Sequence, residues 1–132
     1  GHSRAGMRLM PEYSLGMTAR QVTLLEDTDI GDEGLTVTRL HLACEMACHN
    51  ILVSAYGADD ASVGIRNDIW FWGDAASGDL LHAEAMIAGI DGKRIIFNVF
   101  ARAGTTEVAR GVHERLIVSQ ARFMKSLPGP PD

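Results

Sequence analysis

Residues 40–49 read Leu-His-Leu-Ala-Cys-Glu-Met-Ala-Cys-His, a run of apolar and small side chains with a single carboxylate, that of Glu45. The apolar pattern extends from about residue 38 to residue 55 and covers nearly the whole circumference of a helix. The segment therefore predicts one long helix that is buried on almost all sides. Because burying an unpaired charge costs much free energy, Glu45 needs either a charged partner or a pocket.

Glu45 shares one stripe of this predicted helix with His41 and His49, because residues four apart lie one turn above one another. Such an acid is either a site residue or a structural carboxylate paired with an arginine such as Arg115. We favour the site, since buried acids cluster at functional sites. Several side chains of the helix are also potential metal ligands, but one helix rarely supplies a tetrahedral set, so we expect no metal. These are His41, Cys44, Glu45, Cys48 and His49.

The composition is that of an ordinary globular protein, with 46% hydrophobic and 22% charged residues. A length of 132 residues fits one domain with one core. The opening Gly-His-Ser looks like the remnant of an expression tag. We therefore expect a tag remnant at residues 1–6, a single domain at residues 7–127 and a flexible tail at residues 128–132.

The charge and cysteine content exclude several classes of protein. A formal net charge of −5, without a cluster of Lys or Arg, argues against binding to nucleic acid. No apolar run approaches the length of a membrane span. Cys44 and Cys48 are the only cysteines, and their spacing of one helical turn disfavours a mutual disulfide. We therefore expect reduced thiols and a cytoplasmic protein that binds neither nucleic acid nor membrane.

Five segments have the alternation and β-branched content of strands. The first, at residues 16–25, precedes an acidic loop at residues 26–34 and the helix, for which Thr36 or Thr38 is the expected N-cap. Four more are expected to follow as a meander, at residues 62–72, 79–90, 94–101 and 107–119, with Asp91-Gly92 as a hairpin turn. One long helix beside antiparallel strands predicts an α+β domain whose sheet curls around the helix.

Residues 40–123 resemble the hot-dog thioesterase superfamily, and most closely its fluoroacetyl-CoA thioesterase-like branch. The resemblance rests on three segments in the same order: the helix at residues 42–48, the turn and strand at residues 77–85, and the last strand at residues 111–118 with its continuation to Phe123. It implies the hot-dog fold, with an antiparallel sheet wrapped around one central helix. It also implies hydrolysis of an acyl thioester, of coenzyme A or of an acyl carrier protein, at a site between the subunits of a homodimer.

The resemblance implies roles for three residues. Glu45 would act as a general base toward water or as a nucleophile toward the thioester. The backbone N–H of Gly64 would face the developing oxyanion. Arg115 aligns with an arginine near the site, where a guanidinium is suited to orient a carboxylate or to meet a phosphate of coenzyme A.

Anchored on Glu45, the resemblance places Val37 where the family has a threonine that assists catalysis, and Phe71 where it has a catalytic histidine. We expect Thr38, next to Val37, to supply the hydroxyl. Trp70, Phe71 and Trp72 suggest a pocket wall for a bulky, flat or unsaturated acyl group. For the two tryptophans, packing in the core or at an interface is the alternative that the residue type favours. Arg110 and His113 are expected at the surface or at an interface. The predicted substrate-binding residues are Arg115, His49, Trp70, Phe71, Trp72 and Asn67.

Three functions stay open at this point. The first is a thioesterase, with coenzyme A only as part of the substrate and no other cofactor. The second is a hot-dog protein that holds an acyl or aromatic ligand without converting it. The third is another thioester enzyme of the same fold, a dehydratase or a decarboxylase. A pairing of two dimers into a tetramer is also open.

Overall fold

The computed structural model describes residues 12–126, so the predicted tag remnant at residues 1–6 and the tail at residues 128–132 lie outside the described part. The elements, in chain order, are β1 (Thr18–Leu24), the 3-10 turn η2 (Asp27–Asp29), β2 (Ile30–Gly31), β3 (Gly34–Leu35), α1 (Val37–Val53), β4 (Asp60–Phe71), β5 (Leu80–Asp91), β6 (Arg94–Ala103), β7 (Thr106–Ser119) and α2 (Gln120–Ser126). The acidic segment before the helix is therefore a 3-10 turn and a short hairpin rather than a plain loop.

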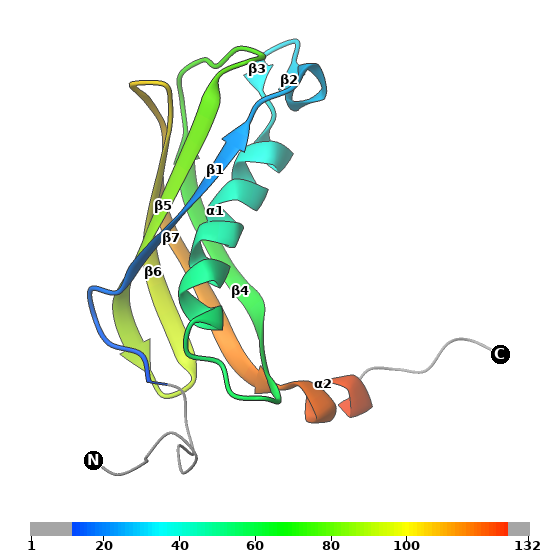
Figure 1. Cartoon of the computed structure of the whole chain (residues 1–132), viewed down its shortest axis with the longest axis vertical. Helices are drawn as coiled ribbons and strands as arrows, with labels where there is room; N and C mark the ends of the chain where they lie inside the picture. The colour runs from blue at the N-terminus through cyan, green and yellow to red at the C-terminus, as the bar shows by residue number, and fades with distance from the viewer. Residues whose placement is uncertain (1–11, 127–132) are drawn as a thin grey trace, which may run out of the picture.

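The main sheet has five antiparallel strands in the order β1-β5-β6-β7-β4, and it curls around α1 (Figure 1). This arrangement confirms the α+β prediction. The predicted four-strand meander is wrong in one strand, because β4 pairs with β7 along its length and not with β5. Alternation shows which face a strand buries, but the chain crosses the sheet between β4 and β5, and nothing in the pattern of β4 specifies its partner.

Only one face of α1 is buried, so the prediction of a helix buried all round is wrong. Buried side chains recur three or four residues apart, whereas Leu42 on the opposite face is 46% exposed. The buried side chains are small along the middle of the helix, so the backbone approaches the alanine-rich inner face of β5 and β6 closely. The core of the helix consists of Leu40, Ala43, Cys44, Ala47, Cys48, Ile51 and Leu52.

Thr36 is the N-cap of α1, and its hydroxyl accepts a hydrogen bond from the backbone N–H of Arg39 at 3.2 Å. Thr38 is therefore free of the capping role that the sequence left open, and it is exposed on the first turn.

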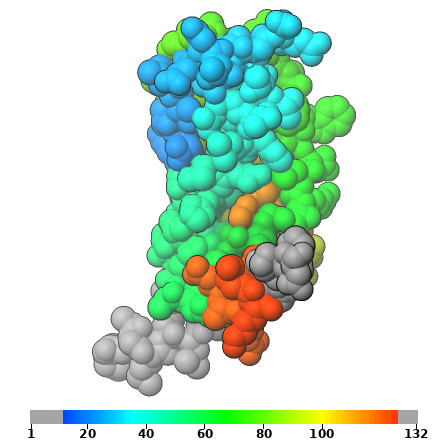
Figure 2. All heavy atoms as spheres, turned by 90° about the vertical axis from the view of Figure 1, so that its right-hand side faces the viewer, coloured from blue at the N-terminus to red at the C-terminus, as the bar shows by residue number. Residues whose placement is uncertain are grey.

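A groove runs between α1 and β4. In Figure 2 the atoms of α1, in cyan to green, and those of β4, in green, flank a hollow in which orange atoms of β7 are visible. The inner face of β7 thus forms the floor of the groove. No helix within residues 12–126 combines the length and the apolar character needed to cross a membrane.

Candidate active site

Glu45 faces the groove from the middle of α1, with its side chain 37% exposed. Its Oε2 atom lies 4.0 Å from Nη1 of Arg115, and its Oε1 atom lies 3.8 Å from Nε2 of His41. A carboxylate sealed against an arginine would be a structural ion pair. Glu45 is instead paired on one side and open to solvent on the other, which leaves it accessible to a ligand.

Arg115 lies on the inner face of β7 and is held there by β4. Its Nε donates to Oγ of Ser62 at 2.8 Å, and its Nη2 donates to the carbonyl oxygen of Ser62 at 3.2 Å. The side chain is only 12% exposed. Two hydrogen bonds to one residue fix the plane of the guanidinium, so Nη1 is directed toward Glu45 and the groove.

His113 is completely buried on the same face of β7, so the expectation of a surface or interface residue is wrong. Its Nδ1 lies 2.6 Å from Oδ1 of Asn67, and its Nε2 lies 3.2 Å from Nη1 of Arg115. With the amide oriented in this way, its oxygen accepts from Nδ1–H, so Nε2 is unprotonated and accepts from Arg115. Alternation along the last strand predicts this face, because His113 lies between Ala109 and Ile117 at even spacing.

The imidazole of His113 is neutral at physiological pH. Burial, reinforced by the positive charge of Arg115, lowers its pKa to about 4. The carboxylate of Glu45 opposes this shift, but it does not outweigh the burial. A neutral imidazole is needed for Nε2 to accept a hydrogen bond from a guanidinium.

Gly64 pairs with Arg115 across the β4–β7 ladder, next to a β-bulge that leaves Ile65 as an extra residue. An added Cβ atom at Gly64 would lie 3.3 Å from Nη1 of Arg115 and 3.4 Å from Cε1 of His113. Both distances are tight for a Cβ contact. The glycine therefore leaves room for the arginine and the histidine to lie close to the strand, and it is itself exposed to the groove.

The remaining predicted residues lie around this cluster at different distances. Thr38 is on the stripe of Glu45 but seven residues earlier, about 10 Å along the helix axis. His49 lies one turn beyond Glu45, where its ring packs edge-on against Tyr56 with centroids 6.3 Å apart. Asn67 belongs to the cluster through its bond to His113. Trp70 is 74% exposed and lies on the outer face of the sheet, opposite Arg110.

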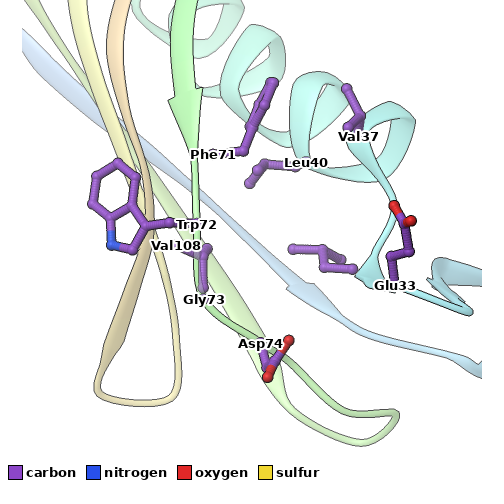
Figure 3. A pocket seen from close by; sticks show the side chains of 9 residues that line it. Glu33, Val37, Leu40, Phe71, Trp72, Gly73, Asp74 and Val108 are labelled. Carbon is purple, nitrogen blue, oxygen red and sulfur yellow. The ribbon is translucent and has the colours of Figure 1, made fainter.

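A pocket of about 410 Å³ lies near the end of the groove, beside the first turn of α1 (Figure 3). Phe71 points toward the helix there, whereas the indole of Trp72 points to the other side of its strand. Val37 and Phe71 thus line one pocket, together with other apolar side chains and the carboxylates of Glu33 and Asp74. Its lining comprises Glu33, Leu35, Val37, Leu40, Phe71, Trp72, Gly73, Asp74 and Val108.

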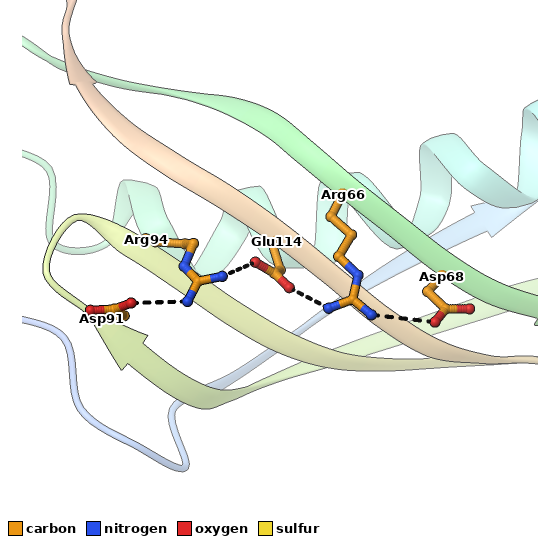
Figure 4. A network of polar contacts seen from close by, with 5 residues as sticks. All are labelled: Arg66, Asp68, Asp91, Arg94 and Glu114. Atoms are coloured by element: carbon orange, nitrogen blue, oxygen red, sulfur yellow. Dashed lines mark hydrogen bonds and ion pairs between the residues drawn. The ribbon is translucent and has the colours of Figure 1, made fainter.

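Glu114 follows His113 in the chain but lies on the opposite face of the sheet. Its carboxylate, 4% exposed, accepts from Arg66 at 2.7 Å and from Arg94 at 3.0 Å, and Asp68 and Asp91 extend the network (Figure 4). The hydrogen bond from Arg66, with the charges of both arginines, lowers the pKa of Glu114 against the opposing effect of burial. This network ties β4 and β6 to β7 and is separate from the groove.

The two cysteines are poor nucleophiles. Both are free and buried. Burial, with a smaller effect of Glu45, raises the pKa of the Cys44 thiol to about 12, and burial likewise raises that of Cys48. Within the described residues, no group of three or more His, Cys, Asp or Glu side chains is arranged to hold a metal ion. Unlike these two thiols, the carboxylate of Glu45 is accessible from the groove.

Comparison with solved structures defines the class of fold. The fluoroacetyl-CoA thioesterase FlK aligns with a TM-score of 0.80 at 16% identity over 89% of this chain and 99% of its own. A thioesterase superfamily member from Thermus thermophilus gives a TM-score of 0.81 at 16% identity, over 88% of this chain and 91% of its own. A hot-dog-like protein from Thermanaerovibrio acidaminovorans gives a TM-score of 0.77 at 19% identity, over 89% of this chain and 96% of its own. The predicted hot-dog fold is confirmed.

A family model then specifies the branch. The model described as "Fluoroacetyl-CoA-specific thioesterase" matches residues 18–121, which is most of the chain. The chain therefore belongs to this family of thioesterases, which hydrolyse thioesters, as the resemblance in the helix and the last strand predicts. No curated protein sequence matches the chain at a significant level.

Proposed function

We propose that this thioesterase hydrolyses an acyl thioester of coenzyme A, or of an acyl carrier protein, in the groove between α1 and β4, with Glu45 as the reacting carboxylate. The observation that carries the proposal is the 4.0 Å approach of Glu45 to Arg115 beside an exposed glycine, Gly64. The space between them is bordered by a carboxylate, a guanidinium and the bare backbone of a glycine. A carbonyl group placed there can reach all three.

Two routes are consistent with this arrangement. In the first, an oxygen of Glu45 forms a bond to the thioester carbon, the C–S bond breaks, and the thiolate leaves and takes up a proton. Water then cleaves the resulting anhydride and restores the carboxylate. In the second, Glu45 removes a proton from water, which attacks the same carbon directly. In both routes the carbonyl oxygen gains negative charge, which the backbone N–H of Gly64 is proposed to stabilise.

The acyl group is proposed to extend along α1 into the pocket at Val37, Leu40 and Phe71. Leu40 lies five residues before Glu45, roughly 7.5 Å along the helix axis. An acetyl group would not reach this pocket from Glu45. The apolar side chains of Val37, Leu40 and Phe71 in this lining favour a medium-length or aromatic acyl group, while Glu33 and Asp74 at the same pocket disfavour an acyl group that ends in a carboxylate.

We further propose a homodimer in which a second copy covers the free edge of β4. Within residues 12–126, this strand forms one edge of the sheet and pairs only with β7, and its Ile65 is 47% exposed. A long edge strand with an apolar side chain is a template for pairing with another chain. Light scattering on the purified protein tests this, with a dimer expected and a monomer at all concentrations contradicting it.

The activity is tested by supplying a panel of acyl-CoA thioesters that differ in chain length, with a reagent that detects free thiol. Wild type is expected to release thiol, and Glu45→Gln is expected to lower kcat by about 10²-fold or more. Glu107→Gln is the matched control, because Glu107 is also partly exposed and paired with an arginine, but on the outer face of the sheet. Ligand binding without thiol release by either wild type or variants would contradict the proposal.

A further inference from the structure

Arg115 uses three of its five N–H groups in hydrogen bonds within the protein. They run from Nε and Nη2 to Ser62, and from Nη1 to Nε2 of His113. One N–H on Nη1 and one on Nη2 remain. Since Nη1 is the atom that lies 4.0 Å from Glu45 and beside Gly64, its remaining N–H is next to the proposed position of the thioester carbonyl.

The hydrogen bond at Nη1 depends on the orientation of His113. Its ring lies against Phe97, with centroids 6.4 Å apart, and its Nδ1–H donates to Asn67. Asn67 lies directly opposite His113 in the β4–β7 register. The bond from Nδ1–H to Asn67 leaves Nε2 unprotonated and directed toward Arg115. A chain of polar contacts thus runs from the exposed Asn67 through the buried His113 to Arg115.

We infer that Arg115 is a catalytic residue that donates its free Nη1–H to the thioester oxygen, and that Asn67 and His113 are positioning residues that hold the guanidinium in place for this bond. The inference rests on the proposed function and deepens it. Position 71, where the resemblance places a histidine, is a phenylalanine in this chain. The inference assigns the polar group next to Glu45 to the guanidinium of Arg115 instead. It also changes the expected role of Asn67 from contact with the substrate to support of His113.

In this arrangement His113 does not have the role of a histidine that transfers protons. Its two ring nitrogens are both engaged within the protein, one as a donor and one as an acceptor. A side chain that only accepts from Nη1 would therefore serve in its place. Glutamine offers such an acceptor, whereas phenylalanine fills the site without one.

The test compares two pairs of variants in steady-state kinetics on the best acyl-CoA of the panel. We expect His113→Phe to lower kcat about 10²-fold, as for loss of an oxyanion donor, and His113→Gln to keep most of the wild-type kcat. Asn67 is exposed, so its variants leave the core intact. Asn67→Ala is expected to lower kcat several-fold with KM unchanged, and Asn67→Asp, which still accepts from Nδ1–H, is expected to retain activity.

Each outcome distinguishes between the proposals. Equal loss of kcat in His113→Gln and His113→Phe, with both folded by circular dichroism, would show that the imidazole itself reacts and would overturn the inference. A rise in KM alone for Asn67→Ala would return Asn67 to substrate binding and would also overturn it. In both cases the wild type still releases thiol, so the proposed function stands. A wild type that hydrolyses no thioester overturns the proposed function and the inference together.

Discussion

Gly64 lies directly opposite Arg115 in the β4–β7 ladder, and the space above its Cα is occupied by the guanidinium. Any side chain at this position must displace Nη1 or the ring of His113. Because Ser62 fixes the guanidinium through two hydrogen bonds, the arginine cannot move away freely. The orientation of the Arg115 guanidinium therefore depends on the absence of a side chain at Gly64.

Gly64→Ala is accordingly expected to lower kcat about tenfold or more, with little change in the melting temperature. The reason is displacement of Nη1 from the carbonyl oxygen rather than loss of folding. Gly31→Ala serves as the control, because an added Cβ there meets its nearest atoms only at 3.7 and 3.8 Å. Unchanged kinetics of Gly64→Ala would show that the position of the guanidinium does not matter for turnover.

Phe71→Ala is expected to change the preference among acyl groups. The substitution removes apolar surface from the pocket, so kcat/KM should fall about tenfold for medium-length acyl-CoAs and stay nearly constant for acetyl-CoA. Trp70→Ala is the matched control, because the neighbouring side chain lies on the outer face of the sheet. An equal loss for all chain lengths would place Phe71 outside the acyl site. Phe71→His is not expected to increase the rate, since its neighbours in the pocket, Val37 and Leu40, are apolar.

His113 is expected to make stability depend on pH between about 6.5 and about 4. Its pKa is lowered on folding from 6.5 to about 4, so in this window the unfolded chain binds a proton that the folded protein does not. The free energy of unfolding from His113 therefore decreases as the pH falls through this range. Urea unfolding at a series of pH values should give a flatter profile for His113→Gln than for wild type. An equally steep profile for the two proteins would contradict this assignment.

Glu114→Gln is expected to destabilise the fold at neutral pH without a specific effect on kcat. The folded-state pKa of Glu114 is depressed from 4.5, chiefly by Arg66, so its stabilising effect is fully present above the pKa of the unfolded chain. This effect is lost as the pH falls through the lower, folded-state pKa. The difference in unfolding free energy between wild type and variant should thus be largest near neutral pH and shrink in acid. A difference that grows in acid would contradict the assignment.

The sequence is sufficient to predict the helix and the strand faces, because periodicity reports which side of an element is buried. It also indicates Glu45, a lone acid in an apolar helix. His113 could have been found from alternation alone, since Ala109 and Ile117 share its face. The pairing of β4 with β7 could not have been found in this way, because these strands are far apart in the sequence and their pairing depends on the whole fold. The burial of α1 was overestimated because the sheet covers only one side of it.

The bulge at Ile65 shifts the phase of β4 by one residue. Before it, even-numbered residues such as Ser62 and Gly64 face α1, and after it odd-numbered residues such as Asn67 and Phe71 do. In a strand without the bulge, the row beyond Gly64 would present Arg66, Asp68 and Trp70 to the groove. The bulge therefore absorbs Ile65 and keeps neutral side chains, rather than charged ones, on the side of β4 that faces α1. Deletion of Ile65 would leave this lining unchanged, because Gly64 on the inner face would then be followed by Arg66 on the outer face and Asn67 on the inner face.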